Sequence, residues 1–385
     1  MPALPSKHKR LYLDHNASAP LAPGVKEAIV DALSTAGNPS SPHAEGRAAR
    51  QWIEQARCTV AEVLGAAALD VVFCSGGTEA NHLGLIGLAR SVGKQRRQIL
   101  IPSTVHPSLW AAAQALEHQG FSLQSVPVDS VGRIDMGAAS ELLAAQPTAV
   151  LALSLVNHEL GTVENVAAVV KLARESGALV YCDAVQALGR LPLSVSTLGI
   201  DAMSVSAHKI GGPKGVGALW IRPGIDVSPI IGGGKQESGR RPGTQATALI
   251  AGFGAAVSQV KEGLGDCDRQ RELCVYLAAQ LMDSGARLLS STEDGVCNTL
   301  CAHFPGIPGD LLVSSFDLVG IAISTGAACS SGTNLPSTVL MAVGLGEDEA
   351  RECIRVSIGR GTTESDVERF ASELPAILAR AKAFS

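Results

Sequence analysis

The chain has 385 residues and a mass of 39.5 kDa, and 46% of its residues are hydrophobic whereas only 17% are charged. This composition excludes a small disulfide-stabilised scaffold and a disordered chain, and at ~100–200 residues per domain it allows two or three domains. The net charge of -5 and the 3% aromatic content provide no basic or base-stacking surface, so we expect no direct contact with nucleic acid.

The sequence predicts neither a membrane span nor a secretory leader. No apolar run approaches the ~18 residues that cross a bilayer, and the basic residues 1–10 are not followed by an apolar core. We therefore expect a cytoplasmic protein with no membrane partner.

The nine cysteines are expected to be reduced thiols, because their number is odd and none forms a C-x-x-C pair. They stand at positions 58, 74, 182, 267, 274, 297, 301, 329 and 353. Cys297 and Cys301 are close in sequence, but no second pair completes a ligand set, so we expect no metal site.

Short β-branched runs alternate with longer Ala- and Leu-rich segments from about residue 69 to residue 222, a pattern typical of a parallel sheet covered by helices. Strands are predicted at residues 71–74, 98–101, 122–126, 149–153, 178–182, 202–205 and 217–221. Helices are predicted at residues 43–64, 78–90, 107–119, 135–145, 166–176 and 246–262. The fold class is therefore α/β, with seven strands in one large, mainly parallel sheet.

A second region follows the Gly-rich segment of residues 231–243, because helix, strand and loop patterns become mixed there. We place the boundary near residue 262. The expected division is a large α/β domain over residues 16–262 and a smaller α+β domain that combines residues 1–15 with residues 263–385.

The most informative segment is residues 204–215 (SVSAHKIGGPKG), in which a strand runs into a Ser/His/Lys cluster and a Gly-rich turn. A lysine at a strand end, beside glycines that permit close approach, could hold a carbonyl cofactor as a Schiff base, and Lys209 is that candidate. The alternative is a solvated loop lysine. The sequence has no nucleotide-binding glycine pattern, which argues against a nucleotide site.

Three further segments place polar groups after predicted strands, at the edge of the sheet where ligands collect. Asp183 could pair with a protonated pyridine nitrogen, although an acidic residue at a strand end is more often a helix cap. Gly77 and Thr78 begin a helix whose free N–H groups could bind a phosphate, or they form an ordinary turn and cap. The His106 imidazole is available for ring stacking or proton transfer, or has a structural role.

Two candidates lie in the second region. Cys329 stands among small residues with glycine on both sides (STGAACSSG, residues 324–332), which is typical of a loop and makes it the thiol best suited to be a nucleophile. Arg355 lies among apolar residues of a strand-like segment, where a guanidinium needs a carboxylate partner. That partner could be a ligand or a structural ion pair.

Together these segments resemble the class V aminotransferases, which are pyridoxal-phosphate enzymes of fold type I, and most closely the group I (NifS/IscS-like) cysteine desulfurases. The matching segments are YLDHNA at 12–17, GNPSSPH at 37–43, SGGTE at 75–79, VNHELG at 156–161, DAVQ at 183–186, SAHK at 206–209, RPGT at 241–244, the Cys329 loop and IR at 354–355. The resemblance covers about residues 11–380, nearly the whole chain.

The resemblance implies a role for each matching residue. Lys209 would bind pyridoxal phosphate covalently, Asp183 would pair with the pyridine nitrogen, and His106 would stack on the ring. Gly77, Thr78, Ser206 and His208 would hold the phosphate, Thr244 would reach it from the partner subunit of a homodimer, Asn157 and Gln186 would contact the ring oxygen and its surroundings, and Arg355 and Asn38 would bind the substrate carboxylate.

The implied reaction converts L-cysteine to L-alanine and leaves the sulfur as a persulfide on Cys329, for transfer to an acceptor protein, for example in iron–sulfur cluster assembly. One alternative is a related lyase that acts on selenocysteine or another amino acid, for which Cys329 would be dispensable. Another is a scaffold or sulfur-relay protein without turnover, although the joint presence of Lys209, Asp183, His106, Cys329 and Arg355 argues against it.

The chain departs from the family pattern around the pocket. Val105 stands where the family usually has Glu, and His158 where it usually has Asn. Gly232 and Lys235 replace a usual His and Gly, and Gln245 a usual Glu or Pro. These departures leave the implied chemistry intact but bear on substrate preference and pathway.

Overall fold

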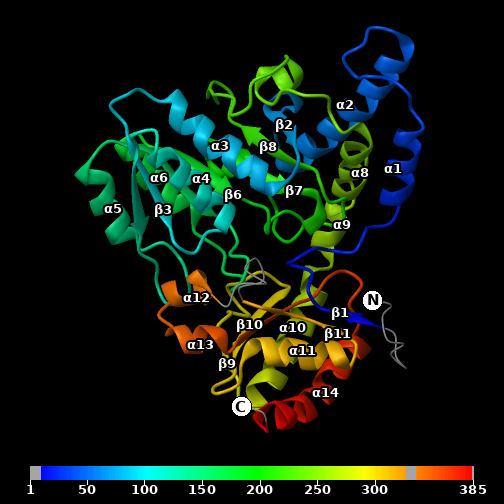
Figure 1. Ribbon diagram of the computed structural model, residues 1–385, viewed down its shortest axis with the longest axis vertical. Coiled ribbons are helices and arrows are strands. Elements are labelled where there is room, and N and C mark those ends of the chain that lie inside the picture. Colours follow the sequence, from blue (N-terminus) through cyan, green and yellow to red (C-terminus); the bar gives the residue numbers. More distant parts are fainter. Residues whose placement is uncertain (1–9, 327–334, 384–385) are drawn as a thin grey trace.

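The computed structural model describes residues 10–326 and 335–383, and its ribbon divides into a larger upper part and a smaller lower part (Figure 1). The upper part contains a seven-stranded sheet in the order β2-β8-β7-β6-β5-β3-β4. Its strands are β2 (Val71–Cys74), β3 (Gln98–Pro102), β4 (Ser122–Val126), β5 (Thr148–Ser154), β6 (Leu179–Asp183), β7 (Ala202–Ser206) and β8 (Gly217–Ile221). The seven predicted strands are confirmed, each within one or two residues at its ends.

Only β8 runs against its neighbours in this sheet, pairing antiparallel with both β2 and β7. The physical reason is the length of the connection. A parallel crossover needs about a dozen residues, usually as a helix, whereas β7 and β8 are joined by residues 207–216, which contain only the 3₁₀ turn Ala207–Lys209. Lys209 therefore lies in a compact turn at the carboxyl end of β7.

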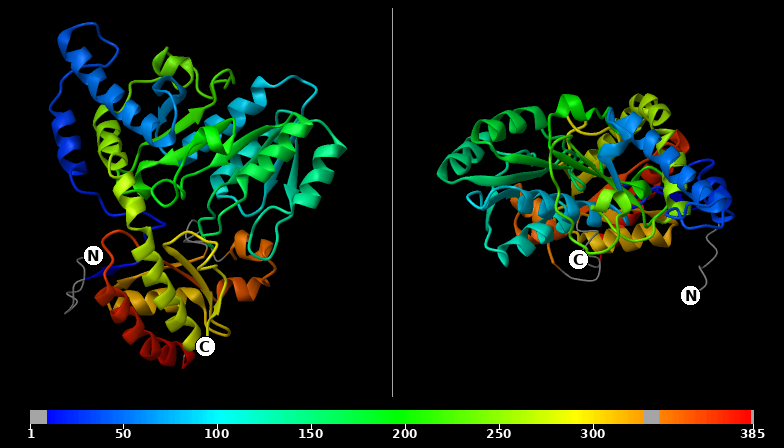
Figure 2. Two further views of the ribbon diagram at one scale, coloured as in Figure 1. Left: turned by 180° about the vertical axis from the view of Figure 1, so that it is seen from behind. Right: turned by 90° about the horizontal axis from the view of Figure 1, so that it is seen from above.

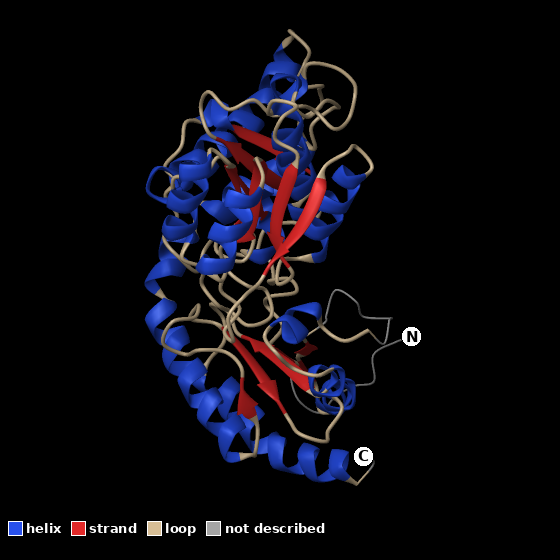
Figure 3. Cartoon of the chain, turned by 90° about the vertical axis from the view of Figure 1, so that its left-hand side faces the viewer, coloured by secondary structure: helices blue, strands red, loops and turns tan. Residues whose placement is uncertain are grey.

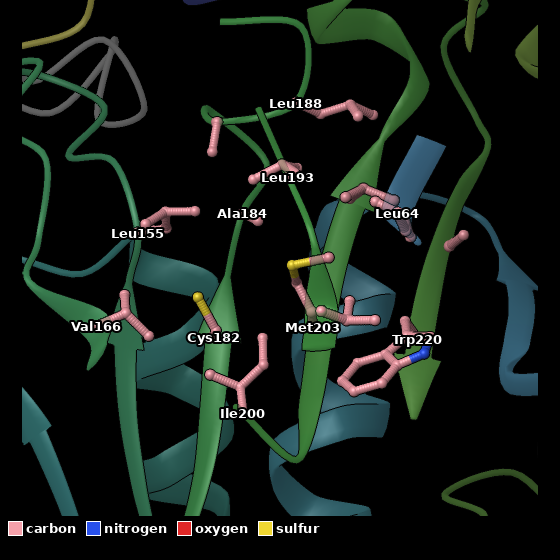
Figure 4. Close-up of a cluster of buried hydrophobic side chains, with 14 of the residues drawn as sticks. Leu64, Leu155, Val166, Cys182, Ala184, Leu188, Leu193, Ile200, Met203 and Trp220 are labelled. Atoms are coloured by element: carbon pink, nitrogen blue, oxygen red, sulfur yellow. The ribbon is translucent and has the colours of Figure 1, made fainter. Parts of the chain in front are cut away.

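Helices cover both faces of the large sheet (Figure 3). On one face α3 (Gly77–Ser91) and α4 (Pro107–Glu117) pack against the strands, forming one apolar cluster. The opposite face carries α2 (Ala44–Leu64), α5 (Met136–Ala145), α6 (Val166–Ser176), α7 (Val195–Leu198) and α8 (Thr247–Val257). Figure 4 shows the cluster on that face, in which Cys182 and Met203 of the strands and Leu155, which follows β5, meet Leu64 and Val166 of the helices.

The lower part is built on a four-stranded antiparallel sheet in the order β12-β13-β10-β9. These strands are β9 (Arg287–Leu288), β10 (Thr299–His303), β12 (Ser324–Thr325) and β13 (Cys353–Ser357). Its helices are α10 (Cys267–Asp283), α11 (Gly309–Leu318), α12 (Thr338–Ala342), α13 (Glu347–Arg351) and α14 (Glu364–Lys382). The separate apolar cluster formed by α10, α11 and α14 with the sheet supplies this part with its own core.

The first described strand of the chain belongs to the lower part, and the residues that follow it form the upper part. Strand β1 (Leu11–Tyr12) pairs in parallel with β11 (Ile321–Ala322), although some 300 residues of sequence separate them. Both views of the back and top of the molecule show this blue segment beside the orange and red C-terminal elements (Figure 2). Residues 13–17 then pass between the two sheets on their way to α1 (Val25–Leu33).

Two helix predictions differ from the structure. Helix α1 was not expected, and the single helix predicted at 246–262 is divided into α8 and α9 (Val260–Gly265). The helical phase is interrupted at Ser258 and Gln259, whose N–H groups bond back to Gly254 and Ala256. None of the described helices is long and apolar enough to cross a membrane.

Substitution of Gly84 tests how closely α3 packs against the sheet. A Cβ atom at this position would lie 2.1 Å from Tyr181 Cε2 and 2.9 Å from Leu219 Cδ1. We expect Gly84→Ala to force α3 outward and to lower the free energy of unfolding by about 1–3 kcal/mol, measured by urea denaturation. Gly93→Ala is the matched control, because nothing lies within 4 Å of its added Cβ. Equal losses in both variants would contradict the close packing.

Candidate active site

The predicted site residues of the upper part gather where β5, β6 and β7 end and α3 and α4 begin. Asp183 is the last residue of β6, His106 is the N-cap of α4, and Gly77 is the first residue of α3. Lys209 follows β7 in the turn described above. The carboxyl ends of parallel strands meet at one edge, so residues far apart in sequence share one site.

Asp183 is fixed by neighbours on two elements. Its Oδ2 accepts a hydrogen bond from Asn81 Nδ2 at 2.9 Å, and its Oδ1 accepts one from the N–H of Val185 at 2.9 Å. Asn81 is in turn held by Tyr181 and Ser204, whose hydroxyls both donate to its Oδ1. The buried carboxylate is therefore held in a defined orientation by hydrogen bonds.

A short chain of hydrogen bonds joins Asp183 to His106. Asn81 Nδ2 also donates to Ser108 Oγ at 2.9 Å, and that hydroxyl lies 2.7 Å from His106 Nδ1. Burial lowers the pKa of His106, while the negative charge of Asp183 opposes this shift and the Lys209 cation adds to it. His106 is thus held neutral at ordinary pH, which suits a ring that stacks or exchanges a proton.

The Lys209 amine lies against the entering segment of the chain. Its Nζ donates to the carbonyl oxygen of Asn16 at 2.5 Å and to that of Ala17 at 3.0 Å. The Asn16 side chain bonds to the His158 carbonyl and to Thr299 of β10. Residues 14–17 therefore connect the lysine to the lower sheet.

The residues predicted to bind a phosphate form a cradle at the start of α3. Gly76, the N-cap, has no side-chain capping bond, and a Cβ at Gly77 would lie 2.9 Å from Val185 Cγ2 and 3.7 Å from Ser206 Cβ. Ser206 Oγ is buried without a hydrogen-bond partner in the described structure. Burial and the nearby lysines lower the pKa of His208 to about 4. Free helix N–H groups, an unpaired hydroxyl and close backbone approach fit an anionic cofactor group.

Arg355 faces this edge from the lower sheet. It lies in β13, whose neighbouring residues Ile354 and Val356 point into the helix-covered core, so that the guanidinium projects from the opposite face. Its Nη1 donates to the His158 carbonyl at 3.0 Å and its Nη2 contacts Asp14 Oδ1 at 2.9 Å. The structure therefore brings Arg355 from the second region to the residues of the first.

The side chains of two further predicted site residues, Asn157 and Gln186, bond to backbone groups of the protein. The Asn157 side chain joins two loops, because it donates to the Thr104 carbonyl after β3 and accepts from the N–H groups of Glu159 and Leu160 in its own loop. Gln186 Nε2 donates to the Asn16 carbonyl. The roles of both toward a cofactor stay predictions.

Three predicted residues are not joined to this cluster. Asn38 is exposed on the connection between α1 and α2, and Thr244 is exposed before α8. Within one chain that connection lies at the far end of the upper part from the lower sheet (Figure 1). Cys329 falls outside the described residues, between Thr325 of β12 and α12.

His158 and Glu159 form a buried polar pair that sequence reasoning did not single out as functional. The His158 ring meets the His106 ring edge-on at 5.3 Å, and its Nε2 lies 3.5 Å from Glu159 Oε1. Burial lowers the pKa of His158 well below its ordinary value and raises that of Glu159 to about 7. Ser337 donates to Glu159 Oε2 at 2.6 Å.

The cysteines near the lower sheet pair with partners from other elements. Cys297 lies beside Cys267 at the start of α10, and Cys301 of β10 packs with Cys353 of β13 in one buried apolar cluster. The spacing of Cys297 and Cys301 therefore reflects two separate packing contacts.

The raised pKa of Glu159 gives a prediction about stability and pH. Because the folded state holds this proton more tightly than the unfolded chain, ionising Glu159 costs stability increasingly as the pH rises from 4.5 to about 7. Glu159→Gln stays neutral, so its stability relative to the unsubstituted chain should rise by up to about 3 kcal/mol between about pH 5 and pH 8. Urea denaturation at both pH values measures this difference.

Glu62→Gln is the control, since Glu62 is exposed and lies 2.8 Å from Lys261. A stability difference for Glu159→Gln that does not change with pH would show that Glu159 is ionised throughout the range.

Comparison with known proteins places the chain in a family. The class-V aminotransferase family model matches residues 11–370. Cysteine desulfurase IscS 1 of Archaeoglobus fulgidus is 36% identical over 377 residues, which cover 97% of this chain and 98% of that protein. The cysteine desulfurase of Cereibacter sphaeroides is 38% identical over 382 residues, which cover 98% of each chain.

Solved structures agree with this assignment. A NifS-like protein superimposes with a TM-score of 0.90 at 33% identity, covering 96% of this chain and 100% of its own. SspA in complex with cysteine has a TM-score of 0.80 at 31% identity, covering 92% and 100%. The predicted fold class is confirmed. The chain belongs to the class-V aminotransferase family and, within it, to the pyridoxal-phosphate-dependent cysteine desulfurases.

Proposed function

We propose that the chain converts L-cysteine to L-alanine and retains the sulfur on Cys329 for delivery to an acceptor. The observation that carries this proposal is the meeting of two groups at one sheet edge. The upper part supplies Lys209, Asp183 and His106. The lower sheet supplies Arg355, which donates to the carbonyl of His158, and the His158 ring contacts the ring of His106. A covalent cofactor site thus faces a cation that suits an amino-acid carboxylate.

The residues present fit pyridoxal phosphate. The unpaired Ser206 hydroxyl, the uncapped start of α3 at Gly77 and the adjacent His208 suit its phosphate, and the oriented Asp183 carboxylate suits its ring nitrogen. When bound, this cofactor supplies a carbonyl that condenses with amines and a ring that accepts electrons from the substrate.

The chain's own groups would divide the remaining work. Arg355 binds and orients the cysteine carboxylate. Lys209 would move protons at the substrate α-carbon, and the Asn16 and Ala17 carbonyls would hold its amine nearby. Asp183 would pair with the pyridine nitrogen, and the Asn81 and Val185 hydrogen bonds hold its carboxylate in place.

The sulfur step is a thiolate displacement at sulfur. The Cys329 thiolate attacks the substrate sulfur, so an S–S bond forms while the Cβ–S bond breaks with its electron pair remaining on carbon. Protonation of that carbon gives alanine, and Cys329 carries a persulfide. Two equivalents of a thiol reductant then release sulfide, restore the Cys329 thiol and become a disulfide.

We extend the proposal to the assembly and the pathway. A homodimer would account for Asn38 and Thr244, which are exposed and lie apart from the Lys209 cluster in a single chain. The domain division at residues 16–262, with residues 1–15 joining residues 263–385, is supported by the two separate sheets and cores. A cytoplasmic location and a sulfur-acceptor protein, such as one in iron–sulfur cluster assembly, complete the proposal.

Lys209→Ala tests the cofactor attachment. The variant should lose the visible absorbance of the covalently bound cofactor, because Lys209, in the turn after β7, is the amine that we propose to carry it. Absorption spectra of both proteins after incubation with pyridoxal phosphate measure the effect. Lys214→Ala, on the same connection, is the control and should keep the band. A band retained in Lys209→Ala would assign the attachment to another lysine.

Cys329→Ser tests the reaction itself. The cofactor-loaded enzyme, given L-cysteine and a thiol reductant, should form equal amounts of alanine and sulfide, whereas the variant should lose at least about a hundredfold in both because serine is a far poorer nucleophile toward sulfur. Cys58→Ser, which changes an exposed thiol on α2, is the control. Turnover indifferent to Cys329, or seen only with selenocysteine, would overturn the desulfurase mechanism.

A further inference from the structure

The Arg355 guanidinium already has a carboxylate partner within the chain. Asp14 Oδ1 lies 2.9 Å from Arg355 Nη2, and the side chains are 3% and 17% exposed for Arg355 and Asp14 respectively. Asp14 belongs to the segment that enters between the two sheets, far from Arg355 in sequence. A buried guanidinium is costly without a counter-ion, so this ion pair stabilises the ligand-free site.

The ion pair between Asp14 and Arg355 leaves one N–H donor of the guanidinium without an acceptor among the described residues. Arg355 Nε is buried and has no hydrogen-bond partner in the part of the chain that the structure describes. In the same part, Arg355 is the one hydrogen-bonded partner of the Asp14 carboxylate, whereas the Asp14 backbone carbonyl accepts from the Tyr12 hydroxyl and the Ala17 N–H. The carboxylate can therefore rotate away, because its backbone anchors do not depend on the ion pair.

We propose that Asp14 is a resident counter-ion that occupies Arg355 between turnovers and competes with the substrate carboxylate for it. The inference rests on the proposed function, in which Arg355 binds that carboxylate. Two carboxylates on one buried guanidinium repel each other, since a single positive charge neutralises only one of them. The incoming carboxylate takes the Arg355 donors, and the Asp14 carboxylate turns toward solvent.

This competition weakens the binding of every amino acid that enters the site, including the product. Alanine carries the same carboxylate as cysteine, so Asp14 recaptures Arg355 as alanine leaves and thereby favours its release. The segment that carries Asp14 also supplies the carbonyls that hold Lys209. Asp14 is therefore a positioning residue that acts through Arg355, and it lowers affinity instead of raising it.

The test measures binding without turnover. 3-Mercaptopropionate carries the carboxylate and thiol of cysteine but has no amino group, so it cannot condense with the cofactor. Calorimetric titration of the cofactor-loaded protein should give a dissociation constant about tenfold lower for Asp14→Asn than for the unsubstituted chain, equivalent to about 1.4 kcal/mol. The same variant should melt at a lower temperature without the ligand, because Arg355 loses its counter-ion.

Two further variants separate this role from a structural one. Asp14→Glu keeps a competing carboxylate and should bind the analogue within about twofold of the unsubstituted chain. Adding Arg355→Gln to Asp14→Asn should abolish the gain in affinity. Asp266→Asn is the matched control, because it removes a carboxylate paired with Arg269 at 2.7 Å, away from the site, and should leave the affinity unchanged.

An unchanged or weaker affinity in Asp14→Asn would overturn the proposal, since a merely supporting ion pair would weaken binding when broken. If Asp14→Asn does not fold, Asp14→Ser takes its place with the same expected gain. Failure of the two proposals is distinguishable. If the enzyme turns over cysteine but Asp14→Asn does not bind 3-mercaptopropionate more tightly, only the role of Asp14 is rejected. If Asp14→Asn binds the analogue more tightly but the enzyme does not turn over cysteine, only the proposed reaction is rejected.

Discussion

Residues 14–17 bond to a cationic side chain from each of the two parts of the molecule, and the arrangement of the site depends on these contacts. The Asn16 and Ala17 carbonyls accept from Lys209 of the upper sheet, while Asp14 pairs with Arg355 of the lower sheet. The segment reaches this position because β1 is fixed to β11 and because Asn16 and Ser357 bond to each other. Without it, the buried Arg355 guanidinium would lose its Asp14 counter-ion and the Lys209 amine would lose two carbonyl acceptors.

The second constraint is the burial of titratable groups around the same edge. Burial lowers the pKa values of His106, His158 and His208, and each is therefore neutral at ordinary pH. The buried Asp183 carboxylate is fixed among these groups by hydrogen bonds from Asn81 and the Val185 N–H. An oriented carboxylate with neutral imidazoles beside it suits a ring nitrogen that carries a proton.

Much of this organisation was predictable from local sequence. The seven strands followed from short β-branched runs, and Lys209, Asp183, Gly77 and His106 followed from their places at strand ends. Asn81 could have been found, since it lies one helical turn beyond Thr78 on the same helix. Helix α1 and the interruption at Ser258 were missed, because both depend on packing between α1, α2 and α8 rather than on a local pattern.

The sequence by itself determined the strand and helix order, the α/β class and the residues able to carry cofactor chemistry, because periodicity and strand-end position are local properties. The tertiary structure alone decided which distant groups meet. Asp14 and Arg355 are 341 positions apart, and Asn81 and Asp183 are 102 apart. No sequence pattern encodes such pairs, because each partner is selected by the charge and burial that folding creates.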